Sequence, residues 1–335
     1  MPPIEIGTVG FPRPGTGATT AAQAEQDGYD VIRFPDTQNL GGDPFLQLAL
    51  AARSTSAILL GTSATNPVTR HPAVTANAIL SIHVESQGRA LLGLGRGDSS
   101  MGHIGLKPAP MATYERYVEE VSTYLSGGEV DQRGFPSRIH WHSDFDLPNV
   151  PIDMVASGPR SIALAGRLAD RVSLTVGADP ERIRWGLEIA RGAAEAAGRD
   201  PSTISFGASI NSTVDDDRRA GLEAIRGVIA AFAHFSAMDD APTAHQPEHQ
   251  QRVSAQLRDD YDTNHHGQPT AEHAQLLNEE FLDWFAVVGT AGEVVARLEP
   301  LIELGLDHLY LIGNRPVARE AFANEVLPAL HRHGD

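Results

Sequence analysis

The sequence predicts an α/β protein: a closed (β/α)8, or TIM, barrel with a helical insertion after its seventh strand, in one domain over residues 1–335. Two observations predict this fold. Short apolar runs rich in β-branched residues alternate with longer amphipathic runs, and about eight such pairs fit within the chain. Parallel strands joined by helices close into a barrel at that number. An open, doubly wound sheet shows the same alternation and is the alternative.

Each predicted strand is short because glycine, proline or polar residues bound its apolar run. The strands cover residues 4–9, 30–34, 57–60, 90–94, 152–156, 171–175, 204–210 and 308–312. The helices that follow them cover residues 19–27, 44–53, 72–87, 114–125, 161–168, 180–197, 216–232 and 318–332. Pro72 stands at a helix start, where a missing amide hydrogen is tolerated, and Gly198 follows a helix end.

Two segments break the alternation. Residues 127–150 combine glycines and prolines with polar residues, which predicts a long loop with room for a hairpin. Residues 233–285 are polar, contain histidines at 234, 245, 249, 265, 266 and 273, and form the predicted helical insertion. Since long excursions from a barrel usually lie over its active face, we expect both segments there.

Charge and composition exclude several classes of function. Lys and Arg number 26 against 43 Asp and Glu, and this net charge of −17 opposes binding to nucleic acids or anionic membranes. The absence of cysteine excludes disulfides, thiolate metal sites and a cysteine nucleophile. No run approaches the ~20 apolar residues that span a bilayer, and the first residues do not resemble a signal peptide. We therefore expect a cytoplasmic protein with a small-molecule substrate.

The loops that follow the strands form the active face of a barrel, so each strand exit is a candidate site. After the fifth strand come Ala156, Ser157, Gly158, Pro159 and Arg160. This small-residue turn leads into a helix whose free amides and dipole attract an anion, and the arginine suits a phosphate. The turn predicts a phosphate site, with a well-capped helix start as the alternative.

The fourth strand runs into a glycine-rich stretch, residues 93–100. Its glycines permit positive φ and a close approach of a ligand to the backbone. The spacing is G-x-G-x-G on the fourth strand, whereas a dinucleotide-binding fold has G-x-G-x-x-G on its first strand. We therefore predict that this loop lines a cofactor at the mouth of a barrel.

Three further exits carry small or polar side chains. Asp36 follows the second strand, where it bonds either a ligand or its own loop. Residues 61–67 follow the third strand and supply several hydrogen-bonding groups, either for a flat ligand or for an ordinary turn. Thr175 and Gly177 follow the sixth strand. Small-residue exits in succession outline a site for a long, flat, phosphorylated ligand.

The histidines of the insertion raise the alternative of a metal site. His245 and His249 are four residues apart, and His265 and His266 are adjacent. No H-E-x-x-H motif is present, however, and acidic partners do not stand at ligand spacing. We therefore predict solvated loop histidines and no bound metal.

Taken together, these exits resemble the bacterial-luciferase-like superfamily of flavin and deazaflavin oxidoreductases. The resemblance spans nearly the whole chain and is carried by residues 61–74 (GTSATNPVTRHPAV), 92–98 (LGLGRGD), 156–160 (ASGPR), 165–170 (AGRLAD), 288–294 (VGTAGEV) and 304–309 (LGLDHL). The branch that uses coenzyme F420, an 8-hydroxy-5-deazaflavin, is the most similar. The T-N-P-x-T-R-H-P and G-R-G-D stretches of this chain are similar to those of two groups in that branch. These are the methylenetetrahydromethanopterin reductases and the F420-dependent glucose-6-phosphate and alcohol dehydrogenases.

The resemblance implies an oxidoreductase that transfers a hydride between C5 of F420 and a small organic substrate. It also implies a non-prolyl cis peptide between Ser63 and Ala64. The residues that it assigns to cofactor binding are Asp36, Ser63, Ala64, Thr65, Asn66, Arg96, Gly97, Asp98, Ala156, Ser157, Gly158, Pro159, Arg160, Thr175 and Gly177. The catalytic candidates for proton exchange are Asp36, His71 and Asp98, with Arg70 beside them.

Two positions depart from the family pattern. Pterin reductases carry a glutamate at the end of the first strand, where this chain has Val9. The sugar-phosphate and alcohol dehydrogenases carry a histidine after the aspartate of the second strand, where this chain has Thr37. Neither a pterin substrate nor the acid–base mechanism of those dehydrogenases therefore transfers directly.

Two other functions fit the same resemblance. One is an FMN-dependent monooxygenase supplied by a separate reductase partner, and the other is a flavin- or deazaflavin-binding protein without catalysis. The family likeness also implies a homodimer. Substrate identity would be set by residues 10–17, 99–112, 127–150 and 233–285.

Overall fold

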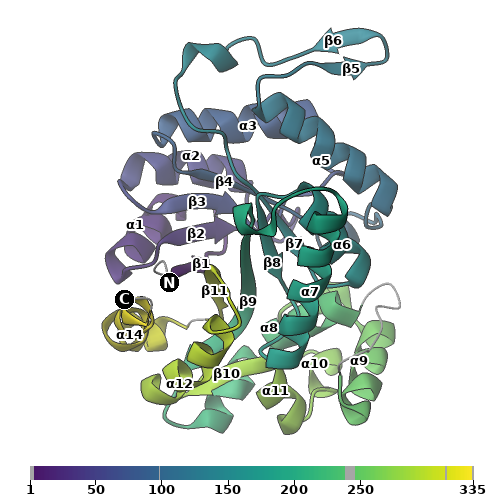
Figure 1. Ribbon diagram of the computed structural model, residues 1–335. Coiled ribbons are helices and arrows are strands. Elements are labelled where there is room, and N and C mark those ends of the chain that lie inside the picture. Colours follow the sequence, from purple (N-terminus) through teal and green to yellow (C-terminus); the bar gives the residue numbers. More distant parts are fainter. Residues whose placement is uncertain (1–3, 98, 238–245, 314, 334–335) are drawn as a thin grey trace.

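Eight parallel strands close into a ring in the computed structural model, which describes residues 4–97, 99–237, 246–313 and 315–333 (Figure 1). In ring order they are β1 (Glu5–Val9), β2 (Val31–Phe34), β3 (Leu59–Thr62), β4 (Ala90–Leu94), β7 (Ile152–Ala156), β8 (Arg171–Leu174), β9 (Ser205–Val214) and β11 (His308–Ile312). Pairing of β9 with β8 and β11, and of β11 with β1, closes the ring. The predicted (β/α)8 barrel is confirmed.

Helices surround the ring on its outside. They are α1 (Gly17–Asp27), α2 (Pro44–Ser54), α3 (Pro72–Glu85), α5 (Met111–Leu125), α6 (Pro159–Leu168), α7 (Pro180–Ala196), α8 (Arg218–Ala237) and α12 (Ala291–Ile302). A short helix α4 (Ser99–Gly102) follows β4, and the chain ends in α13 (Arg319–Ala321), a π-helical turn (Phe322–Val326) and α14 (Leu327–Arg332). The predicted single helix over 318–332 is therefore broken into shorter pieces.

Local sequence signals explain where several helices begin and end. The Asp43 side chain accepts a hydrogen bond from the Leu46 amide at the start of α2, and Pro44 occupies the first turn. Thr290 and Glu293 form a reciprocal capping box at the start of α12. Gly28 ends α1 at φ +91°, a left-handed conformation that favours glycine.

The insertion after β9 is helical, as predicted. It contains the end of α8, then α9 (Glu248–Asp260), α10 (Glu272–Gln275) and α11 (Glu279–Phe285). A short strand that we did not predict, β10 (Ala286–Gly289), follows it and pairs with the carboxyl half of β9. This pairing explains why β9 runs four residues beyond its predicted end at 210.

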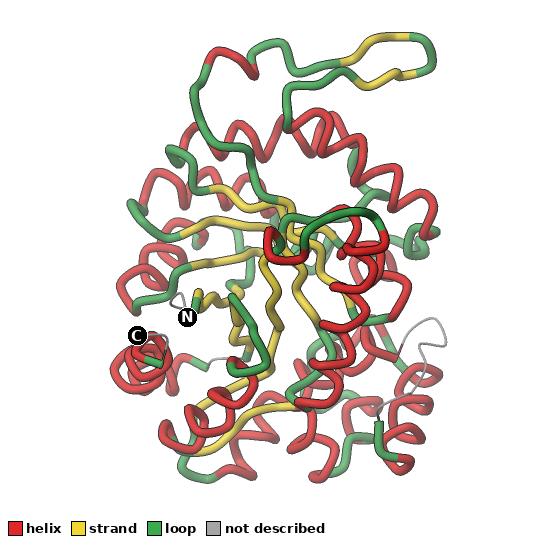
Figure 2. The backbone as a smooth tube through the Cα atoms, in the orientation of Figure 1, coloured by secondary structure: helices red, strands yellow, loops and turns green. Residues whose placement is uncertain are grey.

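The segment 127–150 does contain a hairpin, formed by β5 (Val130–Gln132) and β6 (Phe135–Ser137). Figure 2 shows the hairpin projecting beyond the helices on long loops. The loops are fixed to the barrel helices, because the Trp141 indole donates to Asn77 on α3 and a His142 ring nitrogen lies 2.9 Å from the Leu125 carbonyl oxygen.

The expected place of segment 127–150 over the active face is not what the structure shows. The segment connects the end of α5 to the start of β7, and such helix-to-strand connections lie at the amino ends of barrel strands. Accordingly, none of its residues is among those that line the cavity described below.

The inside of the barrel holds a buried polar network. Arg33 Nη1 lies 3.0 Å from Asp153 Oδ2, and the Ser173 hydroxyl donates to the same carboxylate at 2.7 Å. Burial opposes the charge on Asp153, but the guanidinium groups of Arg33 and Arg171 outweigh it and hold the pKa of Asp153 below its usual range. Burial lowers the pKa of His308 to about 3, so its ring is neutral and meets the Ser173 hydroxyl at 3.0 Å.

Candidate active site

A cavity of about 910 Å³ opens at the carboxyl ends of the strands. The exits of β1, β2, β3, β4, β7, β8 and β11 line it, together with one face of α8 and residues 266–268 of the insertion. The cavity therefore lies where a barrel places its active site.

Asp36, at the exit of β2, lines this cavity although it is only 2% exposed. Its Oδ2 accepts from the Thr65 hydroxyl at 2.7 Å, its Oδ1 accepts from Gln38 Nε2 at 2.6 Å, and Arg70 Nε lies 3.4 Å from Oδ2. Burial raises the pKa of Asp36 despite these partners. Asp36 therefore lines the cavity, where a ligand could reach it, and it also bonds side chains of its own loop and of the loop after β3.

The other candidates for proton exchange lie elsewhere. Arg70 makes an ion pair with Asp43 at 2.6 Å and stacks on the Phe45 ring, and it does not line the cavity. His71 is exposed and caps α3, because its Nδ1 accepts from the Ala73 amide. The geometry gives His71 no catalytic place. Asp98 lies outside the described residues.

The exit of β3 presents Ser63 and Ala64 to the cavity, and the peptide bond between them is cis, as the resemblance implied. Thr65 and Asn66 are buried behind them. Asn66 Oδ1 accepts from the backbone amides of Val68 and Thr69, so this side chain shapes its own loop. Thr65 and Asn66 thus support the cavity wall without lining it.

The exit of β4 lines the cavity with Gly95, Arg96 and Gly97. Arg96 Nε donates to the Ala109 carbonyl at 3.0 Å, which fixes the guanidinium against the next loop. Gly97 has φ +83°, and a Cβ there would come within 2.9 Å of Met101. Only glycine meets both conditions without strain.

The exit of β7 brings the predicted phosphate site into the cavity: residues 156–160 all line it. Gly158 is the N-cap of α6 and offers no side-chain oxygen to cap the helix amides. Ser157 donates to the Phe235 carbonyl at 2.8 Å, while the Arg160 side chain is exposed. The first turn of a ten-residue helix and an arginine therefore face the same space.

Of the two residues predicted at the exit of β8, Thr175 and Gly177, one lines the cavity and the other does not. Thr175 lines the cavity, is 2% exposed, and its hydroxyl has no hydrogen-bond partner. Gly177 does not line the cavity; a Cβ there would lie 2.8 Å from the Phe285 ring, so this glycine is needed for packing.

A set of apolar side chains that was not identified from the sequence also lines the cavity. We name it the apolar wall, defined as Val9, Phe11, Leu40, Ile225, Val228, Phe232, Phe235, Ile312 and Pro316. Val228, Phe232 and Phe235 stand at i, i+4 and i+7 on α8, so the helical spacing of large apolar residues was the available signal.

The charges that line the cavity are mostly positive, although the chain carries a net charge of −17. They belong to Arg13, Arg96, Arg160 and Arg315, with Asp36 as the only carboxylate among the described lining residues. Arg315 is paired with Asp215, which lies outside the lining. Such a local excess of positive charge attracts an anionic ligand.

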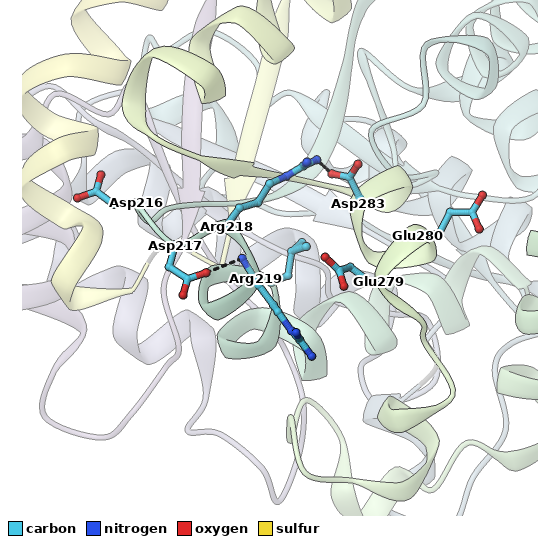
Figure 3. A pocket seen from close by; sticks show the side chains of 8 residues that line it. Asp216, Asp217, Arg218, Arg219, Glu279, Glu280 and Asp283 are labelled. Carbon is cyan, nitrogen blue, oxygen red and sulfur yellow. Dashed lines mark hydrogen bonds and ion pairs between the residues drawn. The ribbon is translucent and has the colours of Figure 1, made fainter.

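A second, smaller hollow of about 510 Å³ lies between the start of α8 and α11 (Figure 3). Its lining residues are Asp216, Asp217, Arg218, Arg219, Leu222, Glu279, Glu280 and Asp283. Arg218 pairs with Asp283, and the Arg219 amide donates to Asp217. Since its charges are of both signs and partly satisfy one another, we assign it no ligand.

Within the described part of the chain, histidine, aspartate and glutamate side chains do not gather in threes as metal ligands would. The described helices also include none that is long and apolar enough to cross a bilayer.

Comparison with known families gives one match over most of the chain: the family described as luciferase-like monooxygenase matches residues 6–308. Among individual relatives, a 5,10-methylenetetrahydromethanopterin reductase of Methanolobus tindarius is 28% identical over 294 residues, which cover 86% of this chain and 87% of the reductase. An F420-dependent hydroxymycolic acid dehydrogenase of Mycobacterium tuberculosis is 33% identical over 220 residues, covering 60% of this chain and 59% of the dehydrogenase.

Solved structures show the same barrel. The coenzyme F420-dependent tetrahydromethanopterin reductase of Methanopyrus kandleri superimposes with a TM-score of 0.76 at 25% identity, covering 97% of this chain and 99% of the reductase. An F420-dependent secondary alcohol dehydrogenase, solved with an F420–acetone adduct, superimposes with a TM-score of 0.75 at 20% identity, covering 98% and 99%. At that lower identity the likeness concerns the fold alone.

Proposed function

The chain belongs to the luciferase-like monooxygenase family, and we propose that within it the protein is an oxidoreductase that uses coenzyme F420 to exchange a hydride with a small organic substrate. The observation that carries the proposal is the cavity at the strand exits. It combines small side chains, the open first turn of α6 and an excess of positive charge. The F420-dependent relatives support this choice of cofactor.

The residues present fit a flat ring with an anionic tail. Ser63, Ala64 and Gly97 present at most a hydroxymethyl group to the cavity, which leaves room for a planar ring. The buried, unpartnered Thr175 hydroxyl is a hydrogen-bonding group that a ligand in the cavity would satisfy. Arg160 and the first turn of α6 are positioned to hold a phosphate.

When bound, the deazaflavin supplies the redox chemistry by accepting or donating a hydride at C5. The protein supplies orientation. Asp36 holds Thr65, the residue next to Ala64, and thereby fixes the loop on which the ring would rest. Arg96, held by the Ala109 carbonyl, fixes the neighbouring loop in the same way.

Binding and oxygen consumption test this function together. Purified protein is titrated with oxidised F420 and with FMN, and binding is followed by the spectral change of each. We expect F420 to bind at least about tenfold more tightly than FMN, a difference of ~1.4 kcal/mol. Tight FMN binding with oxygen consumption on addition of FMNH2 would instead identify a monooxygenase.

The finer part of the proposal is that the protein is a homodimer, which the family likeness alone supports. Light scattering on purified protein tests it directly, since a monomer of 35.8 kDa and a dimer differ twofold in mass.

A further inference from the structure

We propose that the apolar wall is the substrate subsite, that it takes an uncharged ketone or secondary alcohol with a hydrocarbon body, and that His266 exchanges the substrate's proton. This inference rests on the proposed F420 chemistry and adds a substrate class and a catalytic residue to it.

The order of strands in the ring places part of the apolar wall opposite the cofactor residues. The exits of β4 and β7 hold Arg96, Gly97 and the turn at 156–160. In an eight-strand ring the exits of β11 and β1 stand opposite these two. Val9 and Phe11 follow from β1, and Ile312 from β11, so this part of the apolar wall lies across the cavity from those exits. Phe235, at the end of α8, lies beside the turn instead, because its carbonyl accepts a hydrogen bond from Ser157.

The chemistry of the apolar wall favours an uncharged occupant. Its side chains are aliphatic or aromatic, and desolvating a charge against them without a partner is unfavourable. Two arginines lie nearby, but Arg13 is exposed at the rim, and Arg315 already pairs with Asp215. A hydrocarbon body gains from burial here, whereas a carboxylate on it would lose its hydration.

His266 is the group at this wall that can carry a proton. Among the described residues that line the cavity, Asp36 and His266 are the carboxylate and the imidazole. Asp36 already has Thr65, Gln38 and Arg70 as partners. His266 stands beside Phe235 of the apolar wall, with their ring centroids 6.1 Å apart.

Tyr261 orients the His266 ring. Its hydroxyl lies 2.6 Å from Nδ1 of His266, and we assign proton exchange with the substrate to the other ring nitrogen, Nε2. Among the described residues, the His103 ring lies 6.2 Å from the His266 ring, and the His234 and His273 rings pack on the Tyr261 ring at 4.0 and 4.2 Å.

The reaction balances with these groups and reduced F420 as the co-reactant. In ketone reduction, the carbonyl carbon takes the hydride and its electron pair, and the carbonyl π bond breaks. The oxygen then takes a proton from protonated His266, which gives the alcohol and neutral imidazole, while the proton that reduced F420 loses together with the hydride passes to solvent and leaves oxidised F420. Alcohol oxidation runs through the same steps in reverse, with His266 as the base.

The substrate class is tested with two ketones of equal length, 2-octanone and 7-oxooctanoate, which differ by a terminal carboxylate. F420 affinity is first measured by spectral titration, and then the oxidation of reduced F420 by each ketone is followed. We expect kcat/KM for 2-octanone to exceed that for 7-oxooctanoate at least about tenfold. Equal or reversed preference, or no oxidation by either ketone although F420 binds, would overturn the inference. Failure to bind F420 would overturn the proposed function itself.

A second readout needs no cofactor. Saturation-transfer NMR detects 2-octanone on the cofactor-free protein, and Val228→Asp, which places a carboxylate in the apolar wall, should weaken that signal at least about threefold while leaving F420 affinity within about twofold. An unchanged signal would show that the ketone binds elsewhere.

The role of His266 is tested with His266→Asn and a matched control, His265→Asn. His265 is the adjacent histidine, is 57% exposed and bonds Asp262 instead of lining the cavity. We expect His266→Asn to lower kcat for 2-octanone reduction at least about 100-fold, with F420 affinity unchanged, and His265→Asn to lower neither. Tyr261→Phe should have a smaller effect on kcat, because it orients the ring only.

The pH profile separates a catalytic from a structural role. Reduction needs protonated His266, so the wild-type rate should fall as pH rises, and His266→Asn should lose that dependence. Exogenous imidazole should restore part of the rate of His266→Ala. Equal activity of the His266 and His265 variants, or an unchanged pH profile, would contradict the assignment.

Discussion

Replacing Arg160 with alanine should weaken cofactor binding far more than it weakens the fold. The side chain lines the cavity in the first turn of α6 and is exposed, so it contributes little to packing. A hydrogen bond to a charged group contributes about 1.5–3 kcal/mol, which corresponds to a loss of roughly 10- to 150-fold in F420 affinity. The free energy of unfolding should stay within about 0.5 kcal/mol of wild type.

The assay is a spectral titration with F420 at two salt concentrations, paired with urea denaturation. Salt should weaken wild-type binding more than that of Arg160→Ala, because the variant lacks one charge that salt screens. Arg184→Ala is the matched control, since Arg184 is an exposed arginine on α7 that does not line the cavity. Unaltered F420 affinity in Arg160→Ala, or an equal loss in the control, would refute the phosphate site at α6.

Three further predictions concern the barrel and its mouth. Asp153→Asn should lower the free energy of unfolding by about 3–5 kcal/mol in urea denaturation, because it leaves Arg33 buried without its counter-charge. Glu85→Gln, at the exposed pair with Arg53, should cost less than ~1 kcal/mol. Because the pKa of Asp153 is lowered by folding, the difference between wild type and Asp153→Asn should be complete above the unfolded pKa of about 3.9 and should shrink as pH falls below it. Gly93→Ala should destabilise by at least about 2 kcal/mol in the same assay, since its Cβ would come 1.9 Å from a carbonyl oxygen of β3. Gly97→Val should lower F420 affinity in the spectral titration at least about tenfold and lower the free energy of unfolding by about 1–3 kcal/mol, because its φ of +83° and the contact with α4 force this loop to move.

The eight barrel strands were predictable because parallel strands buried on both faces read as continuous apolar runs. The strand β10 was missed because it lies outside the ring: it pairs with the carboxyl half of β9, and the alternation of eight strands with helices does not predict it. The polar network inside the barrel was also missed. Arg33 and Asp153 are 120 residues apart, and only closure of the ring brings them to 3.0 Å.

The parts of the candidate site that consist of small residues and exposed backbone were predictable from the sequence. Small residues at strand exits and a helix start are local features, and residues 156–160 accordingly all reach the cavity. His71 caps α3 and does not line the cavity, and the sequence alone does not distinguish a residue that caps a helix from one that lines a cavity. His266 was interpreted as solvated, and only packing of the insertion over the barrel shows that it lines the cavity, whereas its neighbour His265 is exposed as expected.

A crystal structure of the protein with oxidised F420 tests the central claim most directly. It should show the deazaflavin ring against Ser63 and Ala64 at the carboxyl ends of the strands, with the phosphate of the tail at the first turn of α6. A ring bound elsewhere, or side chains closing this cavity in the complex, would contradict the account.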